Sequence, residues 1–375
     1  MTLFHEEDVA VPVPRRRLPR ATVAGIWALA VALVVLLVLT FLPTAYVIQR
    51  PGPVYNTLGS ATAADGEEVP LISIEGADTY ATEGALDLLT VQVVGNRERT
   101  PSWVELALAW TDPRKAVLPL DSVFPEGTTT EERNEESAAM MVDSQQEATA
   151  AALTELGYDV GAQLTVHSVI EDSAAEGVVM AGDVIVAADG VDVADAAAVR
   201  EVVNAADGDA VELSIIRDGA DETVSITPRE TEVDGETMLL LGVTLSTVYD
   251  FPIDVTIQLN NVGGPSAGMM FALGIMDELT EASLNGGETV AGTGTITASG
   301  DVGPIGGIRQ KLWGAKDAGA TAFLAPIENC DEVVGHVPPG MDVFAVDTLD
   351  DALEALDVVS TGGAGADELP TCTAD

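Results

Sequence analysis

The sequence predicts a multidomain protein with one N-terminal transmembrane helix, then a small β-rich segment, an α+β domain and a C-terminal α/β domain. Three observations support this fold class. A length of 375 residues is enough for two or three domains. Residues 21–42 form a long uncharged apolar run. Beyond that run, stretches with strand-like alternation are interspersed with helical patterns.

The composition is strongly acidic, with 16 Lys and Arg residues against 61 Asp and Glu residues and a formal net charge of -45. Because phosphate binding needs clustered basic side chains, we expect no nucleic-acid partner. The acidic residues are spread along the chain after residue 60, which favours a surface adapted to a saline medium over one that attracts basic substrates. Cys330 and Cys372 have no metal-ligand spacing, so no metal or other cofactor is expected, and their pairing is left open.

Residues 21–42, ATVAGIWALAVALVVLLVLTFL, are long enough to cross a hydrocarbon core of about 30 Å. Four arginines, at 15–17 and 20, precede this run, and only Arg50 follows it closely. The positive-inside rule therefore places residues 1–20 in the cytoplasm and the chain from residue 45 outside. The run exceeds the roughly 7–15 residues of a signal peptide core, so we expect an uncleaved anchor in the cell membrane.

The segment after the anchor predicts short strands and then one long helix. PLISIEG and LDLLTVQVVG alternate like strands, and residues 45–130 are interpreted as a β-rich stalk. Residues 131–157 have acidic residues in the first turns, strong helix formers throughout and Gly157 as a stop, which predicts a connecting helix.

Residues 160–230 predict strands with a single helix in 194–206. With Gly182-Asp183 before one strand and Asp189-Gly190 as a hairpin turn, this segment resembles a PDZ domain. The resemblance implies a module that adds an extended peptide as a strand at a sheet edge. The alternative is a β-rich spacer that binds nothing.

The stretch NNVGGPSAGMMFALG, residues 260–274, sets one serine between small residues and an apolar run. The run predicts a buried helix over 266–279, and amides at a helix N-terminus can stabilise an oxyanion. Ser266 is therefore a candidate nucleophile, with Gly264, Pro265 and Ala267 as the backbone around the oxyanion; the alternative role of Ser266 is a plain helix cap.

A nucleophilic serine needs a base, and none of the three histidines has a suitable context. The chain holds only Lys115, Lys311 and Lys316 as lysines. Lys311 lies beside the apolar stripe of a predicted helix, where burial would lower its pKa and let it take the proton of Ser266. The alternative is that Lys311 extends from this helix to water.

Three blocks in order resemble the proteolytic domain of Lon proteases: GPSAG (264–268), TGTIT (293–297) and GDVGPIGGIRQKLWGAKDAGA (300–320). The resemblance implies an α/β domain over 235–358, Ser266 as nucleophile and Lys311 as general base. It also implies that Thr293 supports the dyad and that protease domains could form a ring. Residues 359–375 are expected to form a flexible tail.

The chain also departs from Lon enzymes. It has no GxxxxGK[ST] phosphate loop, and Gly263 and VTIQLNN stand where Lon proteins commonly have an acidic residue and histidines. The whole arrangement resembles the membrane-anchored bacterial PDZ and Lon-type proteases without an AAA+ ATPase domain. It implies a serine endopeptidase that uses no nucleotide and cleaves unfolded or extended extracytoplasmic polypeptides. The alternative is an inactive Lon-like scaffold or chaperone; a chymotrypsin-like or HExxH protease does not fit the motifs.

Overall fold

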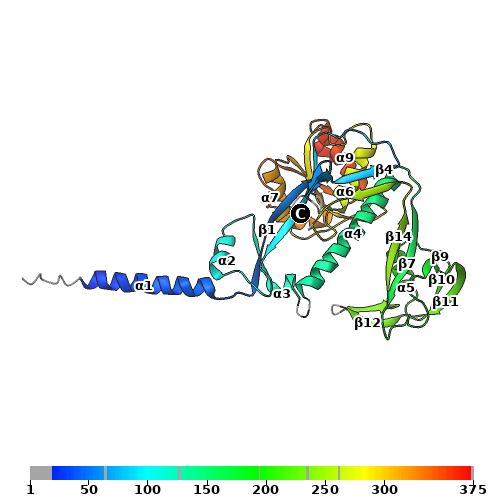
Figure 1. Ribbon diagram of the computed structural model, residues 1–375, viewed down its shortest axis with the longest axis horizontal. Helices are drawn as coiled ribbons and strands as arrows, with labels where there is room; N and C mark the ends of the chain where they lie inside the picture. The colour runs from blue at the N-terminus through cyan, green and yellow to red at the C-terminus, as the bar shows by residue number, and fades with distance from the viewer. Residues whose placement is uncertain are drawn as a thin grey trace, which may run out of the picture. The chain divides into compact units, whose positions relative to one another are not determined.

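The computed structural model describes residues 19–62, 66–125, 127, 129–193, 195–233, 236–260 and 262–372 (Figure 1). The chain divides into one unit of Met1–Arg50 with Gln92–Thr130 and another of Pro51–Val91 with Glu131–Asp375. The expected cytoplasmic N-terminus lies outside the described residues, apart from its last two.

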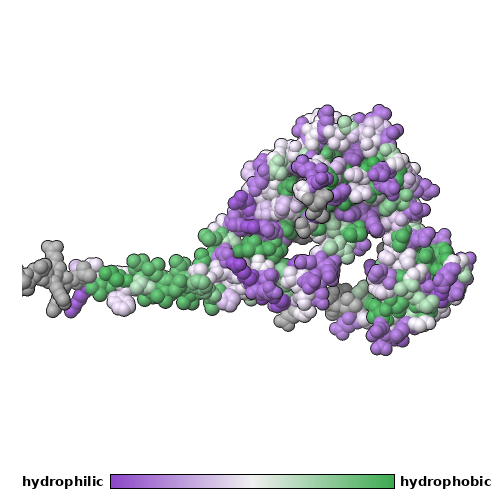
Figure 2. Space-filling model, in the orientation of Figure 1, coloured by the Kyte–Doolittle hydropathy of each residue, from purple (hydrophilic) through white to green (hydrophobic). Residues whose placement is uncertain are grey.

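Helix α1 (Arg20–Phe41) of the first unit is long and apolar enough to span a membrane, with a mean hydropathy of 2.8. None of its residues is buried, and Figure 2 shows hydrophobic side chains along its surface. The boundaries agree with the anchor expected over 21–42.

The rest of the first unit is a small cluster around the start of strand β1 (Tyr46–Asn56). β6 (Ala116–Pro119) pairs antiparallel with Tyr46–Gln49, and a capping box of Ser102 and Glu105 begins helix α2. The cluster's core is formed by Ile48, Leu106 and Ala109. Its helices are α2 (Trp103–Ala109) and α3 (Leu120–Val123).

A mixed sheet with the order β20-β19-β16-β5-β1-β6 forms the centre of the second unit and shares β1 and β5 with the first. β16 is parallel to β5 and to β19, and β19 is parallel to β20. All five residues of β19 are buried, as expected for parallel strands covered on both faces. The bounds are β5 (Ala85–Val94), β16 (Thr289–Gly292), β19 (Ala322–Pro326) and β20 (Asp342–Val346).

Helices cover both faces of this sheet, and successive residues of β19 show it. Leu324 packs in one core with α6, α9 and α4, whereas Phe323 packs in another core with α7 and α8. The result is a three-layer α/β domain. The helices are α4 (Thr130–Glu155), α6 (Gly268–Leu279), α7 (Ile308–Ala318), α8 (Cys330–Val333) and α9 (Leu349–Ser360).

The interpretation of residues 45–130 as a β-rich stalk region is wrong for residues 51–91, which belong to the unit that contains the α/β domain. β5 lies between β1 and β16 in the sheet. β4 (Ile72–Glu75) pairs with β15 (Asp254–Ile257), which is distant from it in the sequence. These strands complete the α/β domain because Ile72, Leu86 and Leu88 are buried in one core with its helices α4, α6 and α9. Two small hairpins complete the elements of this domain: β2 (Ser60–Thr62) with β3 (Glu68–Pro70), and β17 (Thr295–Ile296) with β18 (Val302–Gly303).

The PDZ-like sheet is inserted in the chain between α4 and β15 and has the order β11-β10-β8-β7-β14. Its helix α5 (Ala196–Ala205) begins at the cap Asp195 and agrees with the expected single helix. β14 pairs with β7, so residues 243–250 belong to this sheet and not to the Lon-type domain expected from 235. The strands are β7 (Gly161–Val169), β8 (Val184–Ala188), β9 (Val191–Asp192), β10 (Val211–Arg217), β11 (Ala220–Ile226) and β14 (Val243–Asp250), with the hairpin β12 (Arg229–Val233) and β13 (Glu236–Leu240).

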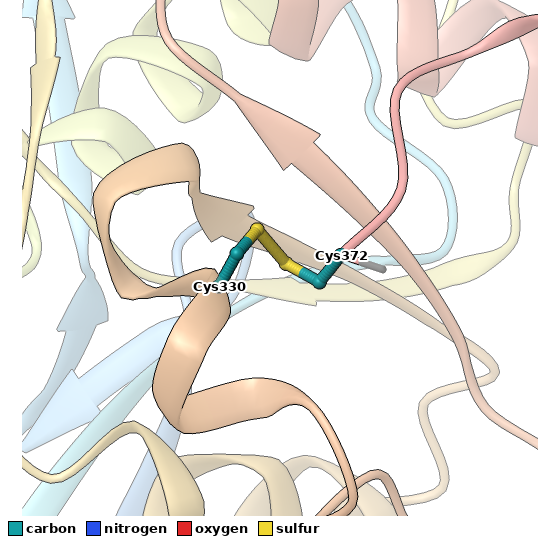
Figure 3. The surroundings of a disulfide bond; sticks show 2 residues. All are labelled: Cys330 and Cys372. Carbon is teal, nitrogen blue, oxygen red and sulfur yellow. A yellow bond between two sulfur atoms is a disulfide. The ribbon is translucent and has the colours of Figure 1, made fainter. Parts of the chain in front are cut away.

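Residues after α9 do not form a free tail within the described part of the chain. Thr371 bridges Phe344 of β20, and the Ala345 N–H donates to the Pro370 carbonyl. Cys372 forms a disulfide with Cys330, the first residue of α8 (Figure 3). The expectation of a flexible segment over 359–375 is therefore wrong up to residue 372, because a strand contact and a covalent bond hold it. The remaining elements are the 3-10 turns η1 (Ile327–Asn329) and η2 (Ala366–Glu368).

Candidate active site

Ser266 lies in a tight loop directly before α6, which begins at Gly268 and not at residue 266 as predicted. No side-chain hydrogen bond caps this helix, whose N-cap residue is Ala267. The Ser266 hydroxyl lies 2.8 Å from the Lys311 ammonium nitrogen, Nζ. The hydroxyl thus points toward a candidate base, which argues against a plain capping role.

Glycines let the chain pass close to its neighbours around this loop. Gly264 has φ of +87°, which glycine adopts without strain. A Cβ on Gly263 would lie 2.8 Å from the Ser137 side chain, and one on Gly268 would lie 2.9 Å from both Ile296 and Ser144. Larger residues at these positions would displace the nucleophile loop from its neighbours.

Lys311 lies on the first turn of α7 and is 1% exposed. Burial lowers the pKa of its amine to about 7, because the charged form loses its hydration. A large fraction of Lys311 is therefore neutral at physiological pH and can accept a proton. The alternative in which Lys311 extends to water is wrong.

Thr293 follows β16, is fully buried and contacts both members of the pair. Its hydroxyl oxygen accepts from Lys311 Nζ at 2.7 Å, and the hydroxyl donates to the Ser266 carbonyl at 2.9 Å. The Gly294 N–H donates to the same carbonyl at 3.1 Å. The structure thus brings together Ser266, Lys311 and Thr293, which the sequence analysis singled out.

The backbone expected around the oxyanion needs correction. Pro265 has no N–H and cannot donate. The Gly264 N–H donates to the Ser137 carbonyl of α4 at 2.8 Å, so it is engaged in this structure. In sequence, the backbone amides nearest the Ser266 hydroxyl are those of Ser266 and Ala267, which directly precede α6.

The sequence analysis missed the contribution of α4. The hydroxyl of Ser144, which is 5% exposed, donates to the Pro265 carbonyl at 2.9 Å. The sequence did contain an indication of this contact, because Ser144 lies on the same face of the predicted helix as Met141, Ala148 and Ala151. A serine on such an apolar face needs a buried hydrogen-bond partner.

Glu147, one turn further along α4, holds two other segments near the site. Its carboxylate accepts from the Tyr249 hydroxyl at 2.8 Å and from the Ala298 N–H at 2.6 Å. Burial raises the pKa of Glu147, and these two hydrogen bonds oppose the rise. α4 is thereby tied to the end of β14 and to the loop after β17.

The PDZ-like domain has a hollow beside α5. It has a volume of about 350 Å³ and is lined by Val199 and Val203 of α5 and by residues 239–245. β14 is the last strand of this sheet, so one of its edges faces away from β7. An apolar hollow beside an edge strand is the geometry that strand addition requires.

Family comparisons define the class of these two domains. Residues 255–358 match the Lon protease (S16) C-terminal proteolytic domain, and residues 133–227 match the PDZ domain. The chain therefore contains a proteolytic domain of the Lon serine peptidase family together with a PDZ domain.

Individual relatives match the C-terminal part of the chain. The Lon protease of Campylobacter concisus is 37% identical over 28% of this chain and 13% of its own length. Lon protease 2 of Bacillus subtilis is 34% identical over 30% of this chain and 21% of its own length. The chain thus spans only a small part of these relatives.

Two solved structures match the PDZ region. They are the PDZ domains of SdrC-like proteins from Listeria monocytogenes and Listeria innocua, each 26% identical over 22% of this chain, with a TM-score of 0.20. The matches cover 85% and 92% of those chains.

Proposed function

We propose that this protein is a membrane-anchored serine endopeptidase that uses a Ser266–Lys311 dyad and needs no ATP. The observation that carries the proposal is the 2.8 Å contact between the Ser266 hydroxyl and the buried Lys311 amine. An amine with a pKa near 7 is matched to proton transfer at neutral pH. Its proposed substrates are unfolded or extended extracytoplasmic polypeptides.

In the proposed mechanism the neutral Lys311 amine accepts the Ser266 proton while the serine oxygen attacks a peptide carbonyl. The amides of Ser266 and Ala267 stabilise the oxyanion. Protonated Lys311 then gives its proton to the departing amine, and water hydrolyses the acyl-enzyme with Lys311 again as the base. Thr293 acts as a positioning residue, because it holds the amine and the backbone of Ser266 together.

The proposed topology places the N-terminus in the cytoplasm, α1 in the membrane and both domains outside. The charge pattern around α1 supports it, and the Cys330–Cys372 disulfide does so independently. Disulfides persist mainly in oxidising, extracytoplasmic compartments. The PDZ domain would select chain ends or exposed strands through the hollow beside α5, and association of protease domains into a ring is a further part of the proposal.

The test is cleavage of unfolded casein by the full chain in lipid nanodiscs, without nucleotide. We expect wild type and Lys316→Ala to cleave, because Lys316 lies on the same helix but its amine donates to the Gly340 carbonyl and not to the Ser266 hydroxyl. Ser266→Ala and Lys311→Ala should lose cleavage while circular dichroism shows an intact fold. Cleavage retained in Ser266→Ala would overturn the assignment, and an inactive wild type would favour the scaffold alternative.

A further inference from the structure

A groove of about 830 Å³ lies between α4 and residues 257–260, 262 and 263. This volume is within the roughly 300–1,000 Å³ of typical ligand sites. The groove reaches Gly263, three residues before Ser266, so a chain lying in it would lead to the nucleophile.

One face of α4 forms the first wall. The lining positions on α4 recur at helical spacing, so they lie on one face of the helix. They are Asn134, Ser137, Ala138, Met141, Val142 and Gln145.

The groove lining is uncharged although the surrounding chain is highly acidic. Among the described residues that line it, none is Asp, Glu, Lys or Arg. α4 itself carries six acidic residues before Ala148, and all of them lie outside the lining. A charged substrate side chain entering this groove would lose hydration without gaining a partner of opposite charge among these lining residues.

Hydrogen bonds fix the α4 wall against the nucleophile loop. The Gly264 N–H donates to the Ser137 carbonyl, and the Ser144 hydroxyl donates to the Pro265 carbonyl. These two hydrogen bonds hold α4 in a fixed position relative to the loop that carries Ser266.

The second wall includes residues 257–260, whose hydrogen bonds run toward β4 and β2. Ile257 pairs with Ile72, the Gln258 N–H donates to the Leu71 carbonyl, and the Asn260 amide donates to the Thr62 carbonyl. The groove lies on the α4 side of this segment. An added extended chain would lie there as a further strand.

We propose that this groove binds an extended polypeptide segment with uncharged side chains and delivers it to Ser266. The inference rests on the proposed protease function and adds the substrate class. Cleavage then occurs within neutral stretches of a polypeptide, and charged residues beside the scissile bond are rejected.

The test measures binding of end-blocked peptides to the full-length Ser266→Ala protein in nanodiscs by fluorescence anisotropy. Blocked ends prevent capture of a chain terminus by the PDZ domain. One peptide is neutral, and its two relatives carry a central Glu or a central Lys. We expect the neutral peptide to bind at least tenfold more tightly than either charged relative.

The matched pair of variants is Val142→Glu, in the groove lining, and Met140→Glu, outside it. Both side chains are on the α4 surface, with exposures of 52% and 40%, so both variants should fold. Val142→Glu should weaken binding of the neutral peptide severalfold and favour the Lys peptide, and Val142→Lys should favour the Glu peptide. Met140→Glu should bind like the parent protein.

Equal behaviour of Val142→Glu and Met140→Glu, or tighter parental binding of a charged peptide, would overturn the groove assignment. Labelling of wild-type Ser266 by a fluorophosphonate tests the nucleophile separately. Normal labelling with no effect at Val142 refutes the groove alone. Absent labelling together with charge-sensitive binding refutes the proposed catalysis and leaves the groove supported.

Discussion

Helices α7 and α4 both contact the nucleophile loop but contribute different things. α7 brings the buried Lys311 amine to the Ser266 hydroxyl. α4 brings the Ser137 carbonyl and the Ser144 hydroxyl to the backbone on the N-terminal side of Ser266. In the proposed mechanism, proton transfer therefore depends on α7, whereas the shape of the loop and its groove depends on α4.

Lys311→Met should reduce cleavage by roughly a thousandfold or more, because it removes the base and retains the buried volume.

The same variant should change how the free energy of unfolding depends on pH. In wild type the unfolded lysine keeps its proton up to about pH 10, whereas the folded one loses it near pH 7. Unfolding free energy should therefore rise with pH across that window. Denaturant titrations at several pH values should show this rise in Lys316→Met but not in Lys311→Met.

The pH profile of kcat/KM should rise with an apparent pKa of about 7, since neutral Lys311 is the active form. Below that pH the rate should fall about tenfold for each unit. Stopped assays from pH 5.5 to 9 would measure it. A flat profile in this range would contradict Lys311 as the base.

Thr293→Val should lower kcat by roughly ten- to a hundredfold, because the amine loses a hydrogen-bond partner and the Ser266 carbonyl loses a donor. Thr293→Ser retains the hydroxyl and should recover most of the rate. Steady-state kinetics of the two variants decide this, and equal loss in both would indicate a packing role only.

Ser144→Ala should have the smallest effect, a drop of about two- to tenfold in kcat/KM, because it removes one support of the loop. The apparent pKa of the pH profile of kcat/KM should be the same in this variant as in wild type. A shifted pKa would show that α4 also tunes the dyad and would weaken the contrast with α7.

The residues of the dyad could be predicted because each lies in a short local motif. GPSAG and the Lys311 segment carry their glycines next to the reactive side chain, and Thr293 opens the block between them. The PDZ-like strands were also predictable, since their half-buried alternation and hairpin turns are local signals.

The role of residues 45–130 was not predictable in the same way. β5 pairs with β16 from the far side of the chain, and no local pattern specifies that partner. The available signal was the set Leu86, Leu88 and Leu89, because three leucines within four positions put apolar side chains on both faces of the strand, which favours the centre of a sheet over a stalk. The contacts of α4 with the loop before α6 could not be predicted either, because no local pattern specifies which distant segment a helix will contact.

The two ends of the inserted PDZ-like domain are neighbours. Gly161, at the start of β7, pairs directly with Asp250, at the end of β14. To the α/β domain the whole insertion is therefore topologically equivalent to one turn between α4 and β15. Once the insertion has folded on its own contacts, β15 can reach β4 across a short effective loop, and the entropy of closing the longer chain no longer opposes that pairing.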